Sequence, residues 1–116
     1  MAEQLPEPKR AMKSFLTANG FEGDYKLKGG VIPAGGIKRN IVSSRVLLCG
    51  DAAGFVDSFY GEGIAYAIRS GQLAAEVLAE IITGKSGSGA IKDYPARCEK
   101  EFGDNLKYSL MLSRLA

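Results

Sequence analysis

Two glycine-bearing segments near the middle of the chain carry the residues best suited to binding a small molecule. The first segment, Gly50–Asp57, places Asp51 directly after a glycine and follows it with Ala52 and Ala53. A glycine lets the backbone turn without a Cβ in the way, and the two alanines add no bulk, so a flat or extended ligand can approach the backbone. The carboxylate of Asp51 can then accept hydrogen bonds from the hydroxyls of a sugar or polyol.

The second segment comes immediately before a long helical pattern. Gly61, Glu62, Gly63 and Ile64 follow one another there. Glycines at this place are predicted to expose free N–H groups at the positive end of the helix dipole, which suits a phosphate or an anionic ring system. A second interpretation stays open: the glycines only make tight turns and close packing, and Asp51 is an N-cap.

Composition excludes several kinds of catalytic site. The chain contains no histidine, so Ser-His-Asp and Cys-His catalysis within it are ruled out, and the commonest zinc ligand is missing. We therefore expect no metal site. Its two cysteines, Cys49 and Cys98, are too few and too far apart for a disulfide framework or a CxxC site, which indicates a reducing, cytoplasmic environment.

Apolar periodicity predicts the elements that must position the two segments. Tyr25–Ile32 alternates like a strand, and Val46–Cys49 is a continuous apolar run typical of a strand buried on both faces. Asp51 would then stand at the carboxyl end of the second strand, where open α/β sheets bind their ligands. A helix is predicted over residues 63–83, with Gly84 after its end. Its predicted core-facing stripe consists of Ile64, Ile68, Gly71, Ala75, Leu78 and Ile82.

Further helices are predicted at both ends of the chain. Apolar residues at helical spacing indicate a short helix over residues 8–18, closed by Asn19 and Gly20. After a flexible linker over residues 85–89, apolar residues recur at every fourth position. This spacing predicts one or two terminal helices, with Pro95 near the start and Gly103 as a kink. The members of this series are Tyr94, Cys98, Phe102, Leu106 and Leu110.

Length and charge bound the class of protein. A chain of 116 residues is enough for one compact domain, and a 46% hydrophobic content can supply its core. The net charge of only +2 argues against a nucleic-acid binder. No stretch comes near the roughly 20 consecutive apolar residues that span a bilayer, and we expect no secretory signal.

The two segments together resemble a known family of flavoproteins. Arg45–Asp57 followed by Gly61–Gly71 looks like the second flavin motif of FAD-dependent oxidoreductases of the para-hydroxybenzoate hydroxylase type. Within that superfamily the chain is most similar to the geranylgeranyl reductases, which the turn Pro33–Gly36 also matches. The resemblance is strong over residues 29–80 and weaker at both ends.

The resemblance implies a role for each matching residue. Asp51 would accept a hydrogen bond from a ribityl hydroxyl of FAD, and the backbone from Gly50 through Ala52 and Ala53 would lie near the pyrophosphate or ribityl chain. Gly61–Ile64, which comprises Gly61, Glu62, Gly63 and Ile64, would lie beside the isoalloxazine ring, where a helix N-terminus favours the anionic reduced flavin.

Four neighbouring residues are left open by the resemblance. Phe59 and Tyr60 line the substrate side of the ring or belong to the core. Arg45 and Asp57 are binding residues or structural ones. No catalytic proton donor can be named.

Where the chain departs from the family, it lacks the Gly-x-Gly-x-x-Gly segment that binds the ADP half of FAD. The resemblance therefore implies the carboxyl-terminal portion of a larger flavoprotein. The expected fold class is α/β: a partial Rossmann-like, glutathione-reductase-type FAD-binding domain with few strands, one long central helix and terminal helices. We expect a helical arm over residues 1–24, the part of the FAD-binding domain with the Gly-Asp motif over 25–84, and terminal helices over 90–116.

The implied function is reduction of carbon–carbon double bonds in geranylgeranyl or other isoprenoid chains, of lipid or chlorophyll type, by the parent protein. Its partners would be FAD, an isoprenoid substrate and the surface of a membrane, and we expect the isolated chain to be inactive. One alternative is a related flavoprotein dehydrogenase or monooxygenase. Another is an inert association module that pairs with a second copy or with a missing amino-terminal half, because the strand Val46–Cys49 expects neighbours on both sides.

Overall fold

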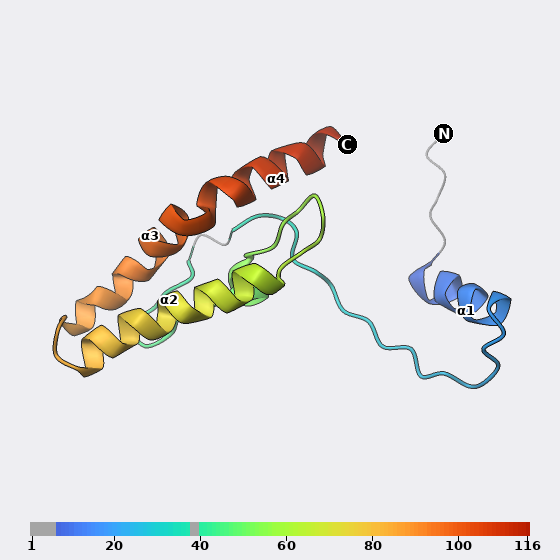
Figure 1. Ribbon diagram of the computed structural model, residues 1–116, viewed down its shortest axis with the longest axis horizontal. Helices are drawn as coiled ribbons and strands as arrows, with labels where there is room; N and C mark the ends of the chain where they lie inside the picture. Colours follow the sequence, from blue (N-terminus) through green and yellow to red (C-terminus); the bar gives the residue numbers. More distant parts are fainter. Residues whose placement is uncertain (1–6, 38–39) are drawn as a thin grey trace. The chain divides into compact units, whose positions relative to one another are not determined.

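The computed structural model describes residues 7–37 and 40–116 of the chain. Its internal contacts divide the chain into two compact units, Met1–Val31 and Ile32–Ala116. The path of the chain through its elements can be followed in Figure 1. The α-helices are α1 (Pro8–Ala18), α2 (Ile64–Ile82), α3 (Tyr94–Cys98) and α4 (Asp104–Leu115). Three short helical turns separate them: η1 (Gly50–Ala53), η2 (Ser88–Asp93) and the π-type turn η3 (Glu99–Gly103).

The first unit contains α1, which forms over the residues that the sequence predicts. Pro8 occupies the first helical turn, where a missing N–H costs nothing. At the other end Gly20 adopts a φ of +76° and donates its N–H to the carbonyl of Thr17, while the N–H of Phe21 bonds to the carbonyl of Leu16. This pair of bonds is a Schellman motif, so Asn19 and Gly20 close the helix as expected. None of the residues of α1 is buried.

The predicted α/β fold class is wrong. Within residues 7–37 and 40–116 no sheet forms, and the only strand-like pairings are two isolated bridges, Val42 with Leu47 and Asp57 with Glu62. The segment Tyr25–Ile32, predicted as a strand, has no ladder partner in the described chain. A strand requires a second segment to pair with its N–H and C=O groups, and alternation in one segment cannot supply that segment.

The predicted buried strand Val46–Cys49 likewise lacks the neighbouring strands that a sheet would need. Its pairing is antiparallel and short: the N–H of Leu48 donates to the carbonyl of Ile41 at 2.8 Å. Val46 remains 53% exposed, and the rest of the run is half-buried. The apolar run therefore marks a segment that packs on helices, not the centre of a parallel sheet.

Helix α2 starts and ends where the sequence predicts. It runs from Ile64 to Ile82, and Gly84 follows with a φ of +73°, donating its N–H to the carbonyl of Ile81. The face that it buries differs from the prediction. Ser70, Leu73, Ala74 and Val77 are buried, and the predicted core stripe is exposed except at the half-buried Gly71. Because α2 is apolar on two opposite faces, periodicity alone cannot tell which face meets the core.

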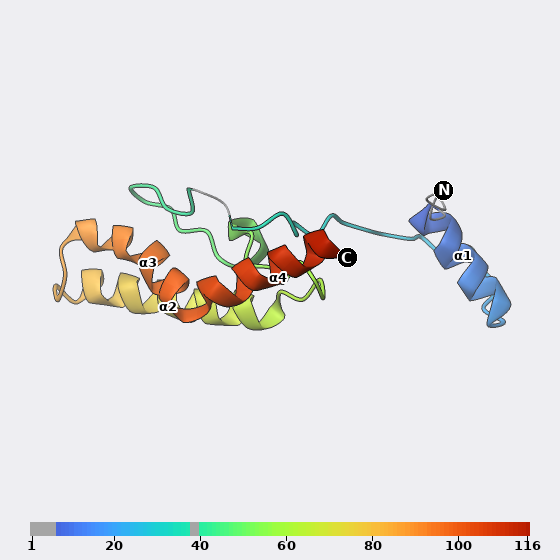
Figure 2. The same ribbon diagram turned by 90° about the horizontal axis from the view of Figure 1, so that it is seen from above.

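Terminal helices form where the sequence predicts them, and they supply the other side of the core. Figures 1 and 2 show α2 lying beside the segment α3–η3–α4, which runs back along it. Pro95 lies in the first turn of α3, and the turn η3 ends at Gly103, where an added Cβ would lie 2.6 Å from the Glu99 carboxyl group. Four of the five residues of the predicted series are buried, namely Tyr94, Cys98, Phe102 and Leu106.

Aromatic contacts join the loop segment to these helices. The ring of Phe102 lies edge-on to Phe55, with ring centres 4.9 Å apart, and to Tyr66 at 5.4 Å. The Tyr94 hydroxyl donates to the carbonyl of Leu48 at 2.9 Å, which satisfies a polar group deep in the core. Burial raises the pKa of the Cys98 thiol, so this cysteine stays protonated at neutral pH.

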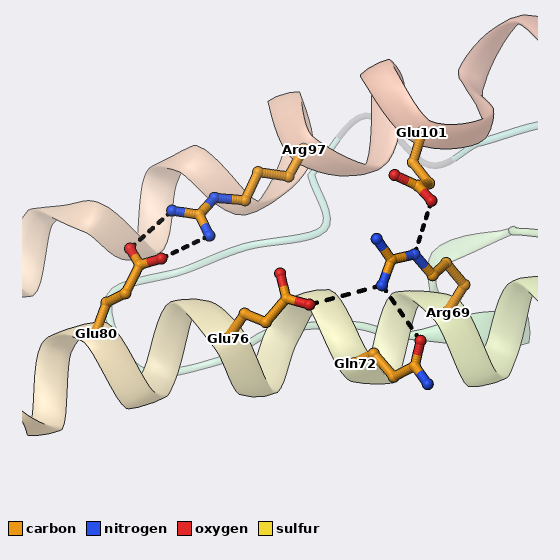
Figure 3. A network of polar contacts seen from close by, with 6 residues as sticks. All are labelled: Arg69, Gln72, Glu76, Glu80, Arg97 and Glu101. Carbon is orange, nitrogen blue, oxygen red and sulfur yellow. Dashed lines mark hydrogen bonds and ion pairs between the residues drawn. The ribbon is translucent and has the colours of Figure 1, made fainter.

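Charged side chains brace α2 against α3 and η3 along one edge. Figure 3 shows Arg97 donating to both oxygens of Glu80, at 2.9 and 2.7 Å, and Arg69 donating to Glu101 at 2.8 Å. The guanidinium of Arg97 holds the pKa of the Glu80 carboxyl below its ordinary value. None of the helices in the described residues is both long and apolar enough to cross a membrane.

Candidate functional site

The backbone at Gly50 fixes the start of the predicted ligand segment against α2. Gly50 has a φ of +53°, and its N–H donates to the buried hydroxyl of Ser70 at 3.0 Å. A Cβ at this position would lie 2.9 Å from the Cβ of Ala67. The left-handed conformation and the close approach each favour glycine, so any other residue would strain the turn or push η1 away from the helix.

Asp51 lies at the N-terminal end of α2, and its carboxylate has no hydrogen-bond partner among the described residues. The residue is exposed, and its Oδ1 would lie 2.9 Å from a Cβ added to Gly63, so glycine at 63 lets the carboxylate lie against the backbone. In the described part of the chain, no hydrogen bond or ion pair involves this carboxylate. The Asp51 side chain is thus free to accept hydrogen bonds from hydroxyl groups.

The N-terminus of α2 has fewer free backbone N–H groups than the sequence predicts. The N–H of Gly61, predicted to be free, donates to the carbonyl of Asp57 at 2.8 Å, which corrects that prediction. Glu62 caps the helix, because its Oε1 accepts the N–H of Ala65 at 3.1 Å. Gly63 is the N-cap residue and has no side chain to cap the helix. The positive end of the dipole therefore meets solvent beside Asp51, with one N–H already satisfied.

Asp57 organises the loop between the two segments. Its Oδ1 accepts the N–H of Phe59 at 2.9 Å, the N–H of Tyr60 at 2.8 Å and the hydroxyl of Ser109 at 2.6 Å. Its own N–H donates to the carbonyl of Glu62 at 2.7 Å and closes the loop. The Ser109 hydroxyl, and then the two backbone N–H groups, hold the pKa of the Asp57 carboxyl below its ordinary value. Asp57 is consequently a structural residue that stays ionised.

A shallow aromatic hollow lies beside this loop. Its volume is about 300 Å³. Burial, then the negative charges of Asp57 and Glu62, raise the pKa of Tyr66, so its phenol stays neutral. Four aromatic rings line the hollow together with three other polar side chains, a carboxylate, an amide and a hydroxyl. It is lined by Asp57, Phe59, Tyr60, Tyr66, Asn105, Tyr108, Ser109 and Leu112.

The structure brings the two predicted segments together at one end of α2. Asp51 contacts the position of Gly63, and Asp57 pairs with Glu62. Not every predicted residue faces solvent. Gly50 and Ala53 are buried, so neither offers a side chain to a ligand. The exposed members are Asp51, Ala52, Gly61, Glu62 and Ile64, together with the half-buried Gly63.

Two polar residues of the site do not appear among the residues predicted from the sequence. Ser70 is fully buried and holds the N–H of Gly50, and Ser109 on α4 holds Asp57 from a position far along the chain. A serine on the apolar side of a predicted helix is the signal that could have identified Ser70. Ser109 carries no such signal, because its partner comes from a distant segment. Arg45 is exposed, on a segment outside the site.

The chemistry of these groups fits the polyol part of a flavin. The chemistry offered is an unpaired carboxylate beside a helix N-terminus, with a glycine in the place where a side chain would fill the space. Hydroxyl groups are the ligands that such an acceptor prefers.

Known proteins resemble the chain over most of its length. It is 31% identical over 109 residues to digeranylgeranylglycerophospholipid reductase 2 of Methanothermobacter thermautotrophicus, covering 93% of this chain and 28% of that protein. It is 38% identical over 88 residues to the reductase of the same name from Methanopyrus kandleri, covering 75% of this chain and 22% of that protein. This chain thus spans about a quarter of the length of these relatives.

A shorter similarity links the chain to menaquinone reductase of Mycobacterium tuberculosis. The two are 40% identical over 60 residues, which are 51% of this chain and 15% of that protein. No family model matches the chain, and no solved structure matches it.

Proposed function

We propose that this chain is the carboxyl-terminal portion of a longer FAD-dependent oxidoreductase that reduces carbon–carbon double bonds of isoprenoid chains. The similarity to digeranylgeranylglycerophospholipid reductases over 93% and 75% of the chain supports an isoprenoid reductase. In that protein the segments Gly50–Ala53 and Gly61–Ile64 would hold part of the flavin. The observation that carries the proposal is the unpaired Asp51 carboxylate at the N-terminus of α2.

Each residue of the site has a distinct proposed task. Asp51 accepts a hydrogen bond from a ribityl hydroxyl, while Gly63 leaves the space in which the carboxylate and the ligand meet. Gly50, held by Ser70, fixes the turn that aims Asp51. The N-terminus of α2 stabilises negative charge at the flavin ring, and Glu62 holds that helix end in place. When bound, the reduced flavin supplies the hydride.

The aromatic hollow suits the substrate side of such a site. Phe59 and Tyr60 stand at the tip of the loop that Asp57 closes, and they line the hollow together with Tyr108 and Leu112. An isoprenoid chain buries apolar surface against rings of this kind. An isoprenoid lipid as substrate would bring the longer protein to the surface of a membrane, inside the cytoplasm.

The test is a titration of the purified chain with FAD, followed by flavin fluorescence. We expect weak binding that falls by about tenfold in Asp51→Asn, since a hydrogen bond to a charged group contributes roughly 1.5–3 kcal/mol and the amide keeps part of it. Asp24→Asn, an exposed aspartate of the other unit, is the matched control and should bind like the unchanged chain. Equal binding by Asp51→Asn and the unchanged chain would remove Asp51 from the site.

A second candidate is a related flavoprotein directed at quinones, favoured by the similarity to menaquinone reductase. The two candidates differ in substrate. A longer protein that carries this sequence would be supplied with reduced flavin and offered either an unsaturated digeranylgeranyl phospholipid or menaquinone. Hydrogenation of the phospholipid supports the first proposal, and turnover of the quinone alone supports the second.

A further inference from the structure

Two buried side chains, each from a different helix, hold the backbone that leads into the turn η1. Tyr94 on α3 donates its hydroxyl to the carbonyl of Leu48 at 2.9 Å, and Ser70 on α2 accepts the N–H of Gly50 at 3.0 Å. Both of these residues have an exposed fraction of 0%. The two bonds lie two residues apart in the backbone, directly before Asp51. The chain therefore enters η1 from a position that α2 and α3 fix together.

The hydroxyl group of Tyr94 is a fixed hydrogen-bond donor inside an apolar core. Burial, and then the neighbouring thiols of Cys49 and Cys98, raise the pKa of this phenol, so it keeps its proton at neutral pH. The Sγ atom of Cys49 lies 3.4 Å from the hydroxyl oxygen, and the Leu48 carbonyl is nearer. A buried hydroxyl is costly unless it is bonded, and the ring of a phenylalanine would fill the same space without that cost. The oxygen is thus explained by the carbonyl that it holds.

Helix α3 is itself fixed in place by a charged pair. Arg97 follows Tyr94 by three residues, about one turn, and donates to both carboxylate oxygens of Glu80 on α2 (Figure 3). Two parallel bonds of this kind define the orientation of the guanidinium as well as its distance. Because α3 has only five residues, its position depends on such contacts. A shift of α3 along α2 would therefore disturb the bond to the Leu48 carbonyl.

We propose that Tyr94 is a positioning residue for ligand binding: by holding the Leu48 carbonyl, it sets the turn that aims the Asp51 carboxylate. Tyr94 is fully buried, so in this role it acts through the backbone and does not touch the ligand. An acceptor that is already in place need not be ordered when the ligand binds, so more of the contact energy appears as affinity. The ligand in this inference rests on the proposed function, whereas the ordering of the turn by Tyr94 does not depend on it.

Amide hydrogen exchange, followed by NMR in the absence of flavin, tests the ordering of the turn. Tyr94→Phe keeps the ring and removes only the oxygen. The N–H groups of Gly50, Gly54 and Phe55 are bonded within or beside η1, so their exchange reports its opening. We expect them to exchange about two- to tenfold faster in Tyr94→Phe, relative to the amides of α2, which is the range for the loss of one hydrogen bond.

A titration with FAD tests the effect on binding. Tyr94→Phe should weaken the binding of FAD by about two- to tenfold. Tyr94→Phe combined with Asp51→Asn should bind like Asp51→Asn alone, because the hydroxyl acts through that carboxylate and the two losses do not add. Ile91→Val is the matched control, since it trims a buried residue of η2 outside the turn. It should lower the urea midpoint and leave both the exchange at the turn and the binding of FAD unchanged.

Arg97→Gln is a milder variant for the case in which circular dichroism shows that Tyr94→Phe has not folded. It loosens α3 from a half-buried edge and should change exchange and affinity in the same direction by less. Turn amides that keep their relative exchange rates, or affinity losses that add in the double variant, would overturn the inference and leave Tyr94 a structural residue of the core. An unchanged chain that binds no FAD would count against the proposed function alone, because the exchange measurement uses no flavin and still decides whether Tyr94 sets the turn.

Discussion

The units Met1–Val31 and Ile32–Ala116 differ in the interactions that stabilise each of them internally. In the first, helix α1 is specified by its own ends, with Pro8 at the start and the Schellman motif at Gly20, and none of its residues is buried. In the second, the ends of α2 are equally local, but its position depends on Phe102, Tyr94 and other residues far along the chain. Local signals can form a helix in either unit, while only the second unit gains stability from packing.

Removing one aromatic ring from each unit should give the largest contrast. Phe102 is 5% exposed and contacts two other rings, so Phe102→Ala should cost about 3–5 kcal/mol and lower the midpoint of thermal unfolding steeply or prevent folding. Phe15 on α1 is 61% exposed, and Phe15→Ala should change stability by less than about 0.5 kcal/mol. Thermal unfolding followed by circular dichroism measures both.

Equal losses of stability in Phe102→Ala and Phe15→Ala would contradict the proposed difference between the two units. They would mean that α1 contributes to the same cooperative unit as the core. Loss of signal at 222 nm in Phe102→Ala before any heating would still agree with it, because a small domain is only a few kcal/mol stable.

A smaller contrast should separate two glycines within the second unit. Gly50→Ala places a Cβ 2.9 Å from that of Ala67 on a backbone with positive φ, and should cost about 2–3 kcal/mol. Gly87→Ala is the matched control, because a Cβ there meets nothing within 4 Å and the φ is −70°. We expect that variant to be neutral or slightly more stable. Urea unfolding of the pair measures the difference, and a tolerated alanine at position 50 would show that η1 can move off α2.

The smallest effect concerns the polar link between α4 and the Asp57 loop. Ser109→Ala should cost about 1.5 kcal/mol at pH 7, because a charged acceptor loses its partner. The pKa of Asp57 is lowered in the fold, so the link stabilises the protein above the unfolded pKa near 4. That stabilisation is lost as the pH falls through the folded pKa. The difference between the two proteins should thus shrink as the pH falls below the unfolded pKa of Asp57.

Urea midpoints at several pH values measure the effect of Ser109→Ala. Ser14→Ala, an exposed serine of α1, is the control and should show no dependence of this kind. A gap between Ser109→Ala and the unchanged chain that stays constant as the pH falls from 7 into the acid range would separate Ser109 from the ionisation of Asp57.

Helix ends could be predicted from the sequence because their signals are local. The proline at residue 8 and the glycines at 20 and 84 mark the ends of α1 and α2 within a few residues. The strands could not be predicted, since a run such as Val46–Cys49 indicates burial without indicating what buries it. The orientation of α2 was predicted wrongly for a related reason: both of its faces are apolar, and only the terminal helices decide which one is covered.

In the candidate site, too, contacts between residues close in sequence could be predicted and contacts between distant residues could not. Asp51 and Gly63 lie close in sequence, and the structure places them in contact, so their proximity followed from the short loop between them. Ser109 lies 52 residues from Asp57 and reaches it only because α4 returns along α2. Free N–H groups were also over-predicted, because the carbonyl that takes up the N–H of Gly61 belongs to the loop itself.

The loop over residues 57–62, which Asp57 closes, affects how strongly a molecule can bind to its two aromatic rings. The N–H groups of Asp57, Phe59, Tyr60 and Gly61 are all bonded within the second unit, although the tip of the loop is at the surface. Ordering one backbone residue costs about 1–2 kcal/mol in conformational entropy. That cost is met when the chain folds, so a molecule that binds against Phe59 and Tyr60 encounters a rigid wall and keeps more of its contact energy as affinity.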